Sequence, residues 1–309
     1  MSRRILVTGA SGDIGEAVGR VLAEIGVEAH GADAGDPFPG RLVYPVVHKT
    51  PLSSDPAYLN HVAELVRRFG YDLVLPLTEP ELSTFAGSAS WPPLLWVGPG
   101  LVRAFLDKLA TADWLAEHRL PAPWTLPIQR LGPADLPLVA KPRQGWGGRG
   151  VTRVESTSAL RALQAHAEAE GAEYVGQQLL LPDDAELTCA VVRLHGVVRT
   201  LQLRRTLVGG LTGRGEVVQD TATERVLHDL SVAADLEGCL NVQLRLTEEG
   251  PRIFEVNPRL SSTVMMRHRL GFEDLRWWLE TEGPEELPPF APPVGTRVFR
   301  LAREVVVRP

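Results

Sequence analysis

The sequence predicts an α/β domain of Rossmann-like type, followed by an α+β region that mixes helices with paired strands. Three observations support this prediction. A short apolar strand from Arg4 to Val7 runs into a glycine-rich turn and then an amphipathic helix. Residues 138–154 read as a strand, a glycine loop and a second strand. Residues 241–257 contain two short, largely apolar runs around a turn, which is typical of a β-hairpin.

Composition limits the classes of protein that the chain can belong to. Its 309 residues, of which 44% are apolar, allow two domains or one domain with a mobile lid. A net charge of −6 without a basic tract lacks the electrostatic footprint of a nucleic-acid binder. No apolar signal region follows Met1 and no run is long enough to span a bilayer, so we expect a cytoplasmic protein. Cys189 and Cys239 have no zinc spacing and are expected to be buried thiols.

The N-terminal turn allows two interpretations. Gly9, Gly12 and Gly15 form a G-x-x-G-x-x-G pattern, and Asp33 follows the second expected strand, Glu28–Ala32. This matches the dinucleotide-binding fingerprint in outline, so an NAD(P)-dependent reductase is one function that the turn allows. Glycines serve equally where a tight turn between strand and helix is needed, with no ligand at all.

Polar residues after a later strand are candidate substrate contacts. The remaining elements expected in the first domain are the strands Leu42–Val47 and Asp72–Pro76 and the helix Pro56–Arg68. Ligands bind at the carboxyl ends of such parallel strands. Thr78, Glu79 and Glu81 come directly after the last strand and are therefore candidates. The alternative is that they cap the following helix.

The second glycine-rich segment predicts a phosphate-binding lid. Its strand delivers Lys141, and four of the six positions from 145 to 150 are glycine. Such a loop loses more backbone entropy than any regular element, so we expect it to close over a ligand. Its N–H groups would cradle phosphates beside the Lys141 ammonium. It is not a Walker A loop, because Gly150 is followed by Val151 where a lysine would be required.

The hairpin predicts a metal site. The expected strands are Asn241–Leu246 and Arg252–Asn257, separated by the five residues 247–251. If facing positions sum to 498, Gln243 lies opposite Glu255 and Asn241 lies opposite Asn257. Strand alternation then places Glu255 and Asn257 on one face, with Phe254 and Val256 pointing into the core.

Amide and carboxylate oxygens in that arrangement suit Mg²⁺, a hard cation that shares its ligands with nucleotide phosphates. Arg259, just past Pro258, is expected to reach a phosphate oxygen beside the metal. The alternative is the polar solvent face of an ordinary hairpin.

Taken together, the glycine loop and the hairpin resemble ATP-grasp enzymes, in particular the carbamoyl phosphate synthetase large-subunit branch, and the resemblance covers nearly the whole chain. It implies a Rossmann-like pre-ATP-grasp domain over residues 1–100 and a two-lobed ATP-grasp domain. The first lobe, residues 101–178, holds a linker helix and the lid, and the second, residues 179–309, holds the metal site. In such enzymes the N-terminal glycine turn shapes a substrate cleft and does not hold NAD.

The resemblance also implies roles for individual residues. Mg²⁺, with Mn²⁺ as an alternative, would be held by Gln243, Glu255 and Asn257. ATP would be bound by Lys108 on a helix expected from Leu101 to His118, by Lys141, by Gly147 and Gly148 of the lid, by Gln177, Gln178 and Leu180 at the adenine hinge, and by Glu186 at the ribose. Arg205, Arg259 and Lys141 would be catalytic. The lid departs from the usual small residues at Gln144, Trp146 and Arg149, and a closing strand is expected from Arg297 to Val307.

The implied activity is ATP-dependent carboxylate–amine ligation through an acyl phosphate, with release of ADP and phosphate. The implied partners are a small-molecule carboxylate and an amine, without nucleic acid or membrane, and a homodimer is among the allowed assemblies. A non-catalytic nucleotide-binding protein and the NAD(P)-dependent reductase remain the alternatives. Asn241 stands where D-alanine ligases have an arginine, which argues against that activity.

Overall fold

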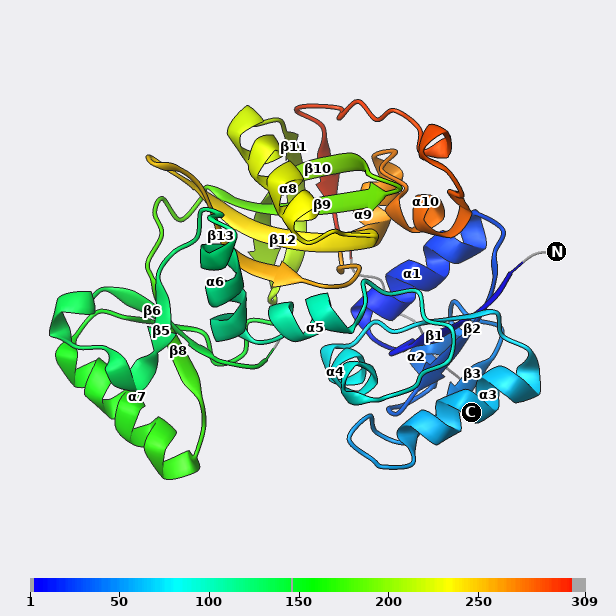
Figure 1. Cartoon of the computed structure of the whole chain (residues 1–309), viewed down its shortest axis with the longest axis horizontal. Coiled ribbons are helices and arrows are strands. Elements are labelled where there is room, and N and C mark those ends of the chain that lie inside the picture. The colour runs from blue at the N-terminus through cyan, green and yellow to red at the C-terminus, as the bar shows by residue number, and fades with distance from the viewer. Residues whose placement is uncertain (1–2, 146, 302–309) are drawn as a thin grey trace.

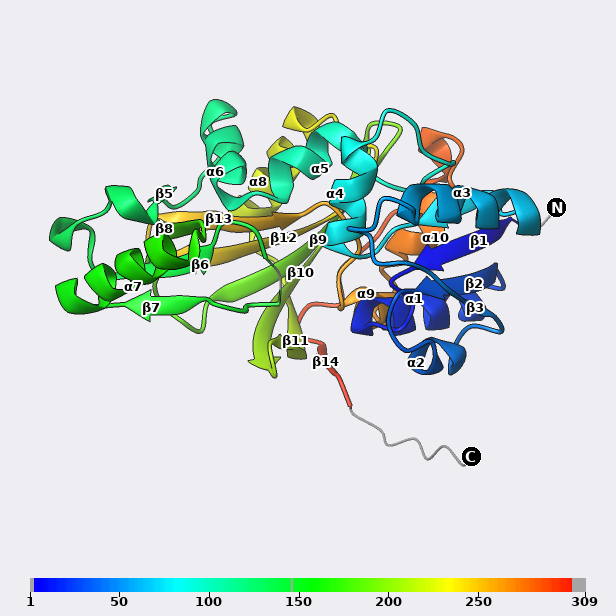
Figure 2. The same ribbon diagram turned by 90° about the horizontal axis from the view of Figure 1, so that it is seen from below.

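The computed structural model describes residues 3–145 and 147–301. Three β-sheets follow one another along the molecule, from the N-terminal domain at one end to the glycine-loop sheet at the other (Figures 1 and 2). None of the described helices is long and apolar enough to cross a membrane.

The first sheet is parallel and has the strand order β3-β2-β1-β4. Its elements are β1 (Arg4–Thr8), α1 (Asp13–Glu24), β2 (Glu28–Asp33), α2 (Phe38–Arg41), β3 (Val47–Lys49), α3 (Tyr58–Phe69), β4 (Leu73–Leu75) and α4 (Glu79–Gly87). The predicted strand Leu42–Val47 is wrong, because the chain turns there and β3 starts only at Val47. Tyr44 in that run is buried against α1, where its hydroxyl donates to the Gly15 carbonyl at 2.6 Å.

The predicted helix Leu101–His118 is two helices, α5 (Pro99–Phe105) and α6 (Lys108–Glu117). Asp107 separates them because its side chain caps α6, accepting from the N–H groups of Leu109 and Ala110 at 2.9 and 3.1 Å. Aspartate is a favoured N-cap residue. Lys108 therefore lies in the first turn of α6.

The second sheet is antiparallel, with the strand order β5-β8-β6-β7. It consists of β5 (Thr125–Pro127), β6 (Leu138–Pro142), β7 (Thr152–Val154) and β8 (Tyr174–Gln178), with α7 (Thr157–Glu170) packed on it (Figure 1). Leu160 and Ala167 of α7 share a buried cluster with Leu138 and Val154 of the sheet. The glycine loop connects β6 to β7.

The third sheet has the strand order β13-β12-β9-β10-β11-β14 and is antiparallel. Its elements are β9 (Glu186–Leu194), β10 (Val197–Val208), β11 (Leu211–Val218), α8 (Thr221–Ala233), β12 (Gly238–Thr247), β13 (Gly250–Asn257), α9 (Val264–Arg269), α10 (Asp274–Glu280) and β14 (Arg297–Phe299). The predicted closing strand is shorter than expected, since β14 ends at Phe299. Residues 302–307 of that prediction lie outside the described residues.

One continuous hydrophobic core joins the first domain to the third sheet. Val18 and Leu22 of α1 belong to the same buried cluster as Leu260, Val264 and Phe272. The N-terminal domain is therefore packed against the segment that follows the β12–β13 hairpin. The domain limits at residues 100 and 178 stay a prediction.

Candidate active site

The β12–β13 hairpin, where the metal site is predicted, has the expected pairing at the end that bears Gln243 and Glu255. Asn241 lies opposite Asn257, and Gln243 lies opposite Glu255. A β-bulge between Gln243 and Leu244 then shifts the register, so that Leu244 faces Ile253. The strands also run further than predicted, and the turn between them is reduced to residues 248 and 249.

The bulge changes the direction of Phe254, which the sequence predicted to point into the core. A bulge adds one residue to one strand and interrupts the simple alternation of faces. Val256 is buried as predicted, but Phe254 is only half-buried and lines the pocket above the hairpin. The ammonium of Lys141 lies 4.8 Å from the centre of the Phe254 ring, a favourable cation–π contact.

The three predicted metal ligands lie in contact with one another. Glu255 Oε1 accepts from Gln243 Nε2 at 3.3 Å and from Asn257 Nδ2 at 3.0 Å. The set offers one carboxylate and two amide oxygens, which are ligands that Mg²⁺ takes. Among the described residues no group of three or more His, Cys, Asp or Glu side chains is arranged for a metal. A cation here would therefore need nucleotide phosphates and water to complete its shell.

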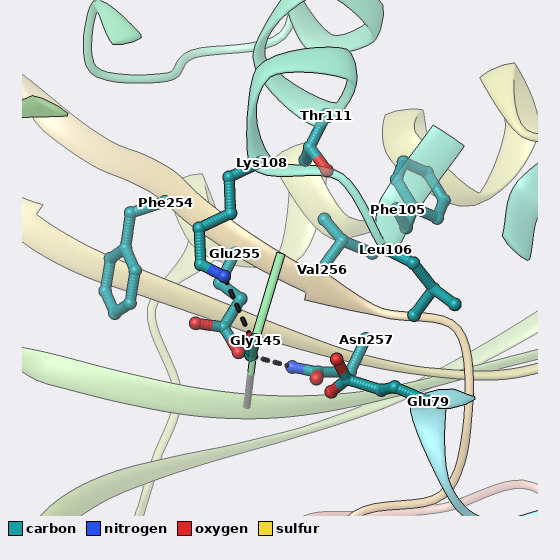
Figure 3. A pocket seen from close by; sticks show the side chains of 10 residues that line it. All are labelled: Glu79, Phe105, Leu106, Lys108, Thr111, Gly145, Phe254, Glu255, Val256 and Asn257. Carbon is teal, nitrogen blue, oxygen red and sulfur yellow. Dashed lines mark hydrogen bonds between the residues drawn. The ribbon is translucent and has the colours of Figure 1, made fainter. Parts of the chain in front are cut away.

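A small pocket lies above this hairpin where three parts of the chain meet (Figure 3). Lys108 Nζ, from the start of α6, donates to the Gly145 carbonyl of the glycine loop at 2.9 Å. Glu79 points in from the start of α4 (Figure 3). The lining residues are Glu79, Phe105, Leu106, Lys108, Thr111, Gly145, Phe254, Glu255, Val256 and Asn257.

Lys141 is a buried cation held by a glutamine. Its side chain donates to Gln177 Oε1 at 2.7 Å, and Gln177 Nε2 donates to Thr125 Oγ1 at 3.0 Å. Burial lowers the pKa of Lys141 to about 8, and the nearby Lys108 acts in the same direction, while Glu255 opposes both. The Gln177 side-chain oxygen is therefore occupied by its hydrogen bond from Lys141, and Gln178 beside it is exposed. Adenine binding by these residues and Leu180 stays a prediction.

Arg205 links the predicted ribose carboxylate to the predicted metal site. Its Nε donates to Glu186 Oε1 at 2.7 Å and its Nη2 donates to Gln243 Oε1 at 2.8 Å. Arg245 pairs with the other oxygen of Glu186 at 2.9 Å and also donates to the Leu180 carbonyl at 2.7 Å. Arg245 was not among the predicted site residues, although it stands two positions after Gln243 on the same strand.

The three candidate substrate contacts after β4 divide into two groups. Thr78 and Glu81 form a capping box: the Thr78 hydroxyl accepts from the Glu81 N–H at 3.4 Å, and Glu81 Oε2 accepts from the Thr78 N–H at 3.3 Å. The capping alternative is thus correct for these two. Glu79 instead lies in the pocket, where it accepts from Arg259 Nη2 at 2.9 Å. Burial raises the pKa of Glu79, and Arg259 opposes this shift.

The glycine loop needs glycine for its backbone conformation. Gly147 and Gly148 have φ values of +67° and +70°, a left-handed region that other residues rarely adopt. A Cβ atom on either would have no neighbour within 4 Å, so no close packing accounts for them. Trp146 between these glycines and Gly145 lies outside the described residues.

The N-terminal turn is explained by its own packing. A Cβ on Gly15 would lie 2.4 Å from the Gly9 carbonyl oxygen, so helix and strand approach too closely for a side chain there. The two carboxylate oxygens of Asp33 accept from the backbone N–H groups of Ser11 at 2.8 Å and Gly35 at 2.7 Å. These contacts account for Gly15 and for Asp33 without a dinucleotide.

Gly15→Ala is expected to lower the free energy of unfolding by about 1–3 kcal/mol, because the added methyl group overpacks the turn. Gly12→Ser should change it by less than roughly 0.5 kcal/mol, because Gly12 has φ −86° and a Cβ there meets nothing closer than 3.6 Å. Urea denaturation of both variants measures the difference. Equal losses would show that Gly12 is structurally required, and a rise in melting temperature with NAD that Gly12→Ser removes would support the reductase.

The comparison with protein families decides the class. A sequence model of the ATP-grasp domain matches residues 105–263, which is just over half of the chain. The protein belongs to the ATP-grasp family. The match includes α6, the glycine loop and the metal hairpin, which are the segments that meet at the pocket. The predicted class is therefore confirmed.

Solved structures extend the similarity in fold to more than nine-tenths of the chain. An L-amino acid ligase from Bacillus licheniformis superposes with a TM-score of 0.72 at 20% identity, covering 93% of this chain and 76% of its own. A carboxyaminoimidazole ribonucleotide synthase from Aspergillus clavatus, solved with ATP, gives 0.75 at 17% identity, with 92% and 78% covered. Biotin carboxylase from Campylobacter jejuni gives 0.69 at 14% identity, with 94% and 72% covered. No curated protein matches the sequence.

These similarities confirm the predicted fold class, a Rossmann-like α/β domain ahead of a two-lobed ATP-grasp domain. The N-terminal domain of this ATP-grasp protein contributes Glu79 to the pocket, so the site is built from both parts of the chain.

Proposed function

We propose that this protein is an ATP- and Mg²⁺-dependent ligase that joins a small-molecule carboxylate to an amine through an acyl phosphate. The main support is the arrangement around Glu255, a carboxylate flanked by two amides. It shares a pocket with Lys108 and Glu79, lies close to the Lys141 ammonium, and Glu79 in turn pairs with the Arg259 guanidinium. Three cations around one oxygen-rich hairpin match the charge of a nucleotide triphosphate and its metal.

Each part of the site has a separate task in such a reaction. A substrate carboxylate attacks the γ-phosphorus of ATP, the bond to the β-phosphate oxygen breaks, and ADP leaves. The amine then attacks the acyl carbon and displaces phosphate. Mg²⁺, which Gln243, Glu255 and Asn257 would hold, would neutralise charge on the transferring phosphoryl group. Lys108 and Lys141 hold the phosphates, Arg259 lies on the substrate side of the hairpin, and the glycine loop excludes water from the acyl phosphate.

Glu79 supports an amine-bearing substrate. Its carboxylate lies at the side of the pocket formed by the first domain, paired with Arg259, and both side chains are 13% exposed. A substrate carboxylate that binds Arg259 frees Glu79 to accept from an ammonium group. One similar structure is named an L-amino acid ligase, and others are named for carboxylation reactions. Amino acids and bicarbonate are therefore the first compounds to test.

The test is a screen for substrate-dependent phosphate release with ATP and Mg²⁺, using pairs of amino acids, other small acids with amines, and bicarbonate. We expect ADP and phosphate as the nucleotide products, identified by chromatography. Glu79→Gln should raise the KM for the amine-bearing substrate more than the KM for ATP, because it removes the charge and keeps the size. AMP and pyrophosphate as the main products would overturn the acyl phosphate mechanism.

A further inference from the structure

A fully buried ion pair lies directly behind the segment that bears Arg259. Arg267 Nη2 and Asp274 Oδ2 are 2.5 Å apart, and each side chain is 2% exposed. Arg267 belongs to α9 and Asp274 is the first residue of α10. Asp274 is fixed in turn by the Leu275 N–H, which donates to its Oδ1 at 3.0 Å.

The second guanidinium nitrogen of Arg267 holds the chain that leaves the metal hairpin. Nη1 donates to the hydroxyl oxygens of Ser261 at 2.9 Å and Thr263 at 3.0 Å. These two oxygens are 2.7 Å apart, and the Thr263 N–H also donates to Ser261 Oγ at 3.3 Å. The segment from Arg259 to Thr263 is thus tied at two of its five residues to one buried cation.

Stability alone is a poor explanation for this pair. A buried ion pair often stabilises a fold no better than apolar residues of similar size, because desolvation offsets the attraction. Arg267 Nε is also buried without a hydrogen-bond partner among the described residues, which adds a further cost. The surroundings are apolar, with Leu260, Val264, Phe272 and Leu275 in the same core, so an apolar pair would fit the site. An apolar pair would lack the hydrogen bonds that Arg267 donates to Ser261 and Thr263.

We propose that Arg267 is a positioning residue for the transfer reaction, which acts through Ser261 and Thr263 to fix the backbone of residues 259–263 and so the position of Arg259. Asp274 holds the guanidinium in its orientation in the core. We call Arg267 with Asp274, Ser261 and Thr263 the clamp. It also connects the site to the first domain, because α9 packs on α1, where Arg269 and His268 contact Glu24.

Two variants separate positioning from stability. Arg267→Met with Asp274→Asn removes both charges together and keeps the Leu275 hydrogen bond, so the melting temperature should stay close to that of the native protein. Ser261→Ala with Thr263→Val keeps the ion pair and removes only its grip on the segment. Each double variant should lower kcat roughly 100-fold, as expected for a misplaced reacting group, with little change in the KM for ATP. All four changes together should lower kcat no further, because both pairs act through one contact.

The kinetic part of this test rests on the proposed function, so a second readout does not need activity. Amide hydrogen exchange of the peptide spanning residues 257–266 should become faster in both double variants. Arg193→Gln is the matched control. It removes a partly buried arginine that pairs with Asp235, and Arg193 lies at the opposite end of β9 from Glu186. Unchanged exchange or unchanged kcat in the double variants would overturn the positioning role. Absence of ATP turnover in the native protein would instead reject the ligase proposal, and exchange would still decide whether the clamp exists.

Discussion

Glu255→Gln is expected to lower ADP formation by roughly 1,000-fold or more while the protein stays folded. The substitution keeps the side-chain size and the two hydrogen bonds from Gln243 and Asn257, but it removes the only carboxylate of the metal set. Loss of a metal that neutralises phosphate charge costs several kcal/mol of transition-state stabilisation, and about 1.4 kcal/mol corresponds to a factor of ten in rate. Steady-state ADP release at saturating Mg²⁺ measures the effect.

The matched control lies in the turn of the same hairpin. Glu249→Gln also removes one negative charge, but Glu249 is 74% exposed and pairs only with Arg252. We expect near-native turnover and an unchanged melting temperature for this variant. If Glu255→Gln keeps more than a tenth of native turnover, the hairpin holds no essential metal, and the polar-face alternative from the sequence becomes the better explanation.

Lys141→Met is expected to remove most of the stabilisation that ATP with Mg²⁺ gives to the native protein. A ligand at a hundredfold excess over its dissociation constant raises the free energy of unfolding by about 2.7 kcal/mol. Lys141 is buried and is the predicted phosphate ligand, so a neutral side chain there should lose that contact. Thermal unfolding with and without ATP measures the loss. Lys49→Met is the control, because Lys49 is exposed and its ammonium donates to the carbonyls of Ala34 and Gly35, away from the pocket.

Because of Lys141, the free energy of unfolding without ligand is expected to depend on pH. Its pKa is about 8 in the folded protein, below its ordinary value of 10.5, because burial disfavours the ammonium. The unfolded chain therefore binds more protons between pH 8 and 10.5, and stability rises with pH across that window. Relative to Lys141→Met, the native protein should gain on the order of 3 kcal/mol from pH 7 to pH 10.5. A constant difference between the two proteins over this range would contradict a buried, charged Lys141.

Local patterns predicted the centre of the site because they depend on few residues. The pairing of Gln243 with Glu255 follows from two apolar runs and a turn, and the structure has that register. The bulge beyond Gln243 has no local signature, since nothing in the run distinguishes it from regular alternation. Phe254 was therefore assigned to the core when it lines the pocket.

Some differences between prediction and structure depend on long-range partners and some do not. Asp107 divides the helix expected over Leu101–His118 by a local contact, because its side chain caps α6 through the Leu109 and Ala110 N–H groups. The selection of Glu79 over its neighbours Thr78 and Glu81 depends on Arg259, 180 residues further on. The role of Glu79 is set only when these distant segments pack together, and no spacing rule within one segment contains it.

The guanidinium of Arg205 couples ligand binding at the predicted ribose site to ligand binding at the predicted metal site. It bonds at once to Glu186, the predicted ribose carboxylate, and to Gln243, a predicted metal ligand. A ribose that hydrogen-bonds to Glu186 would alter the hold of Arg205 on Gln243 and so the affinity of the metal site. A cation at Gln243 would change the affinity for the ribose by the same free energy, since such coupling is reciprocal. Nucleotide and metal affinities measured one at a time would then not add up to the affinity of the complex.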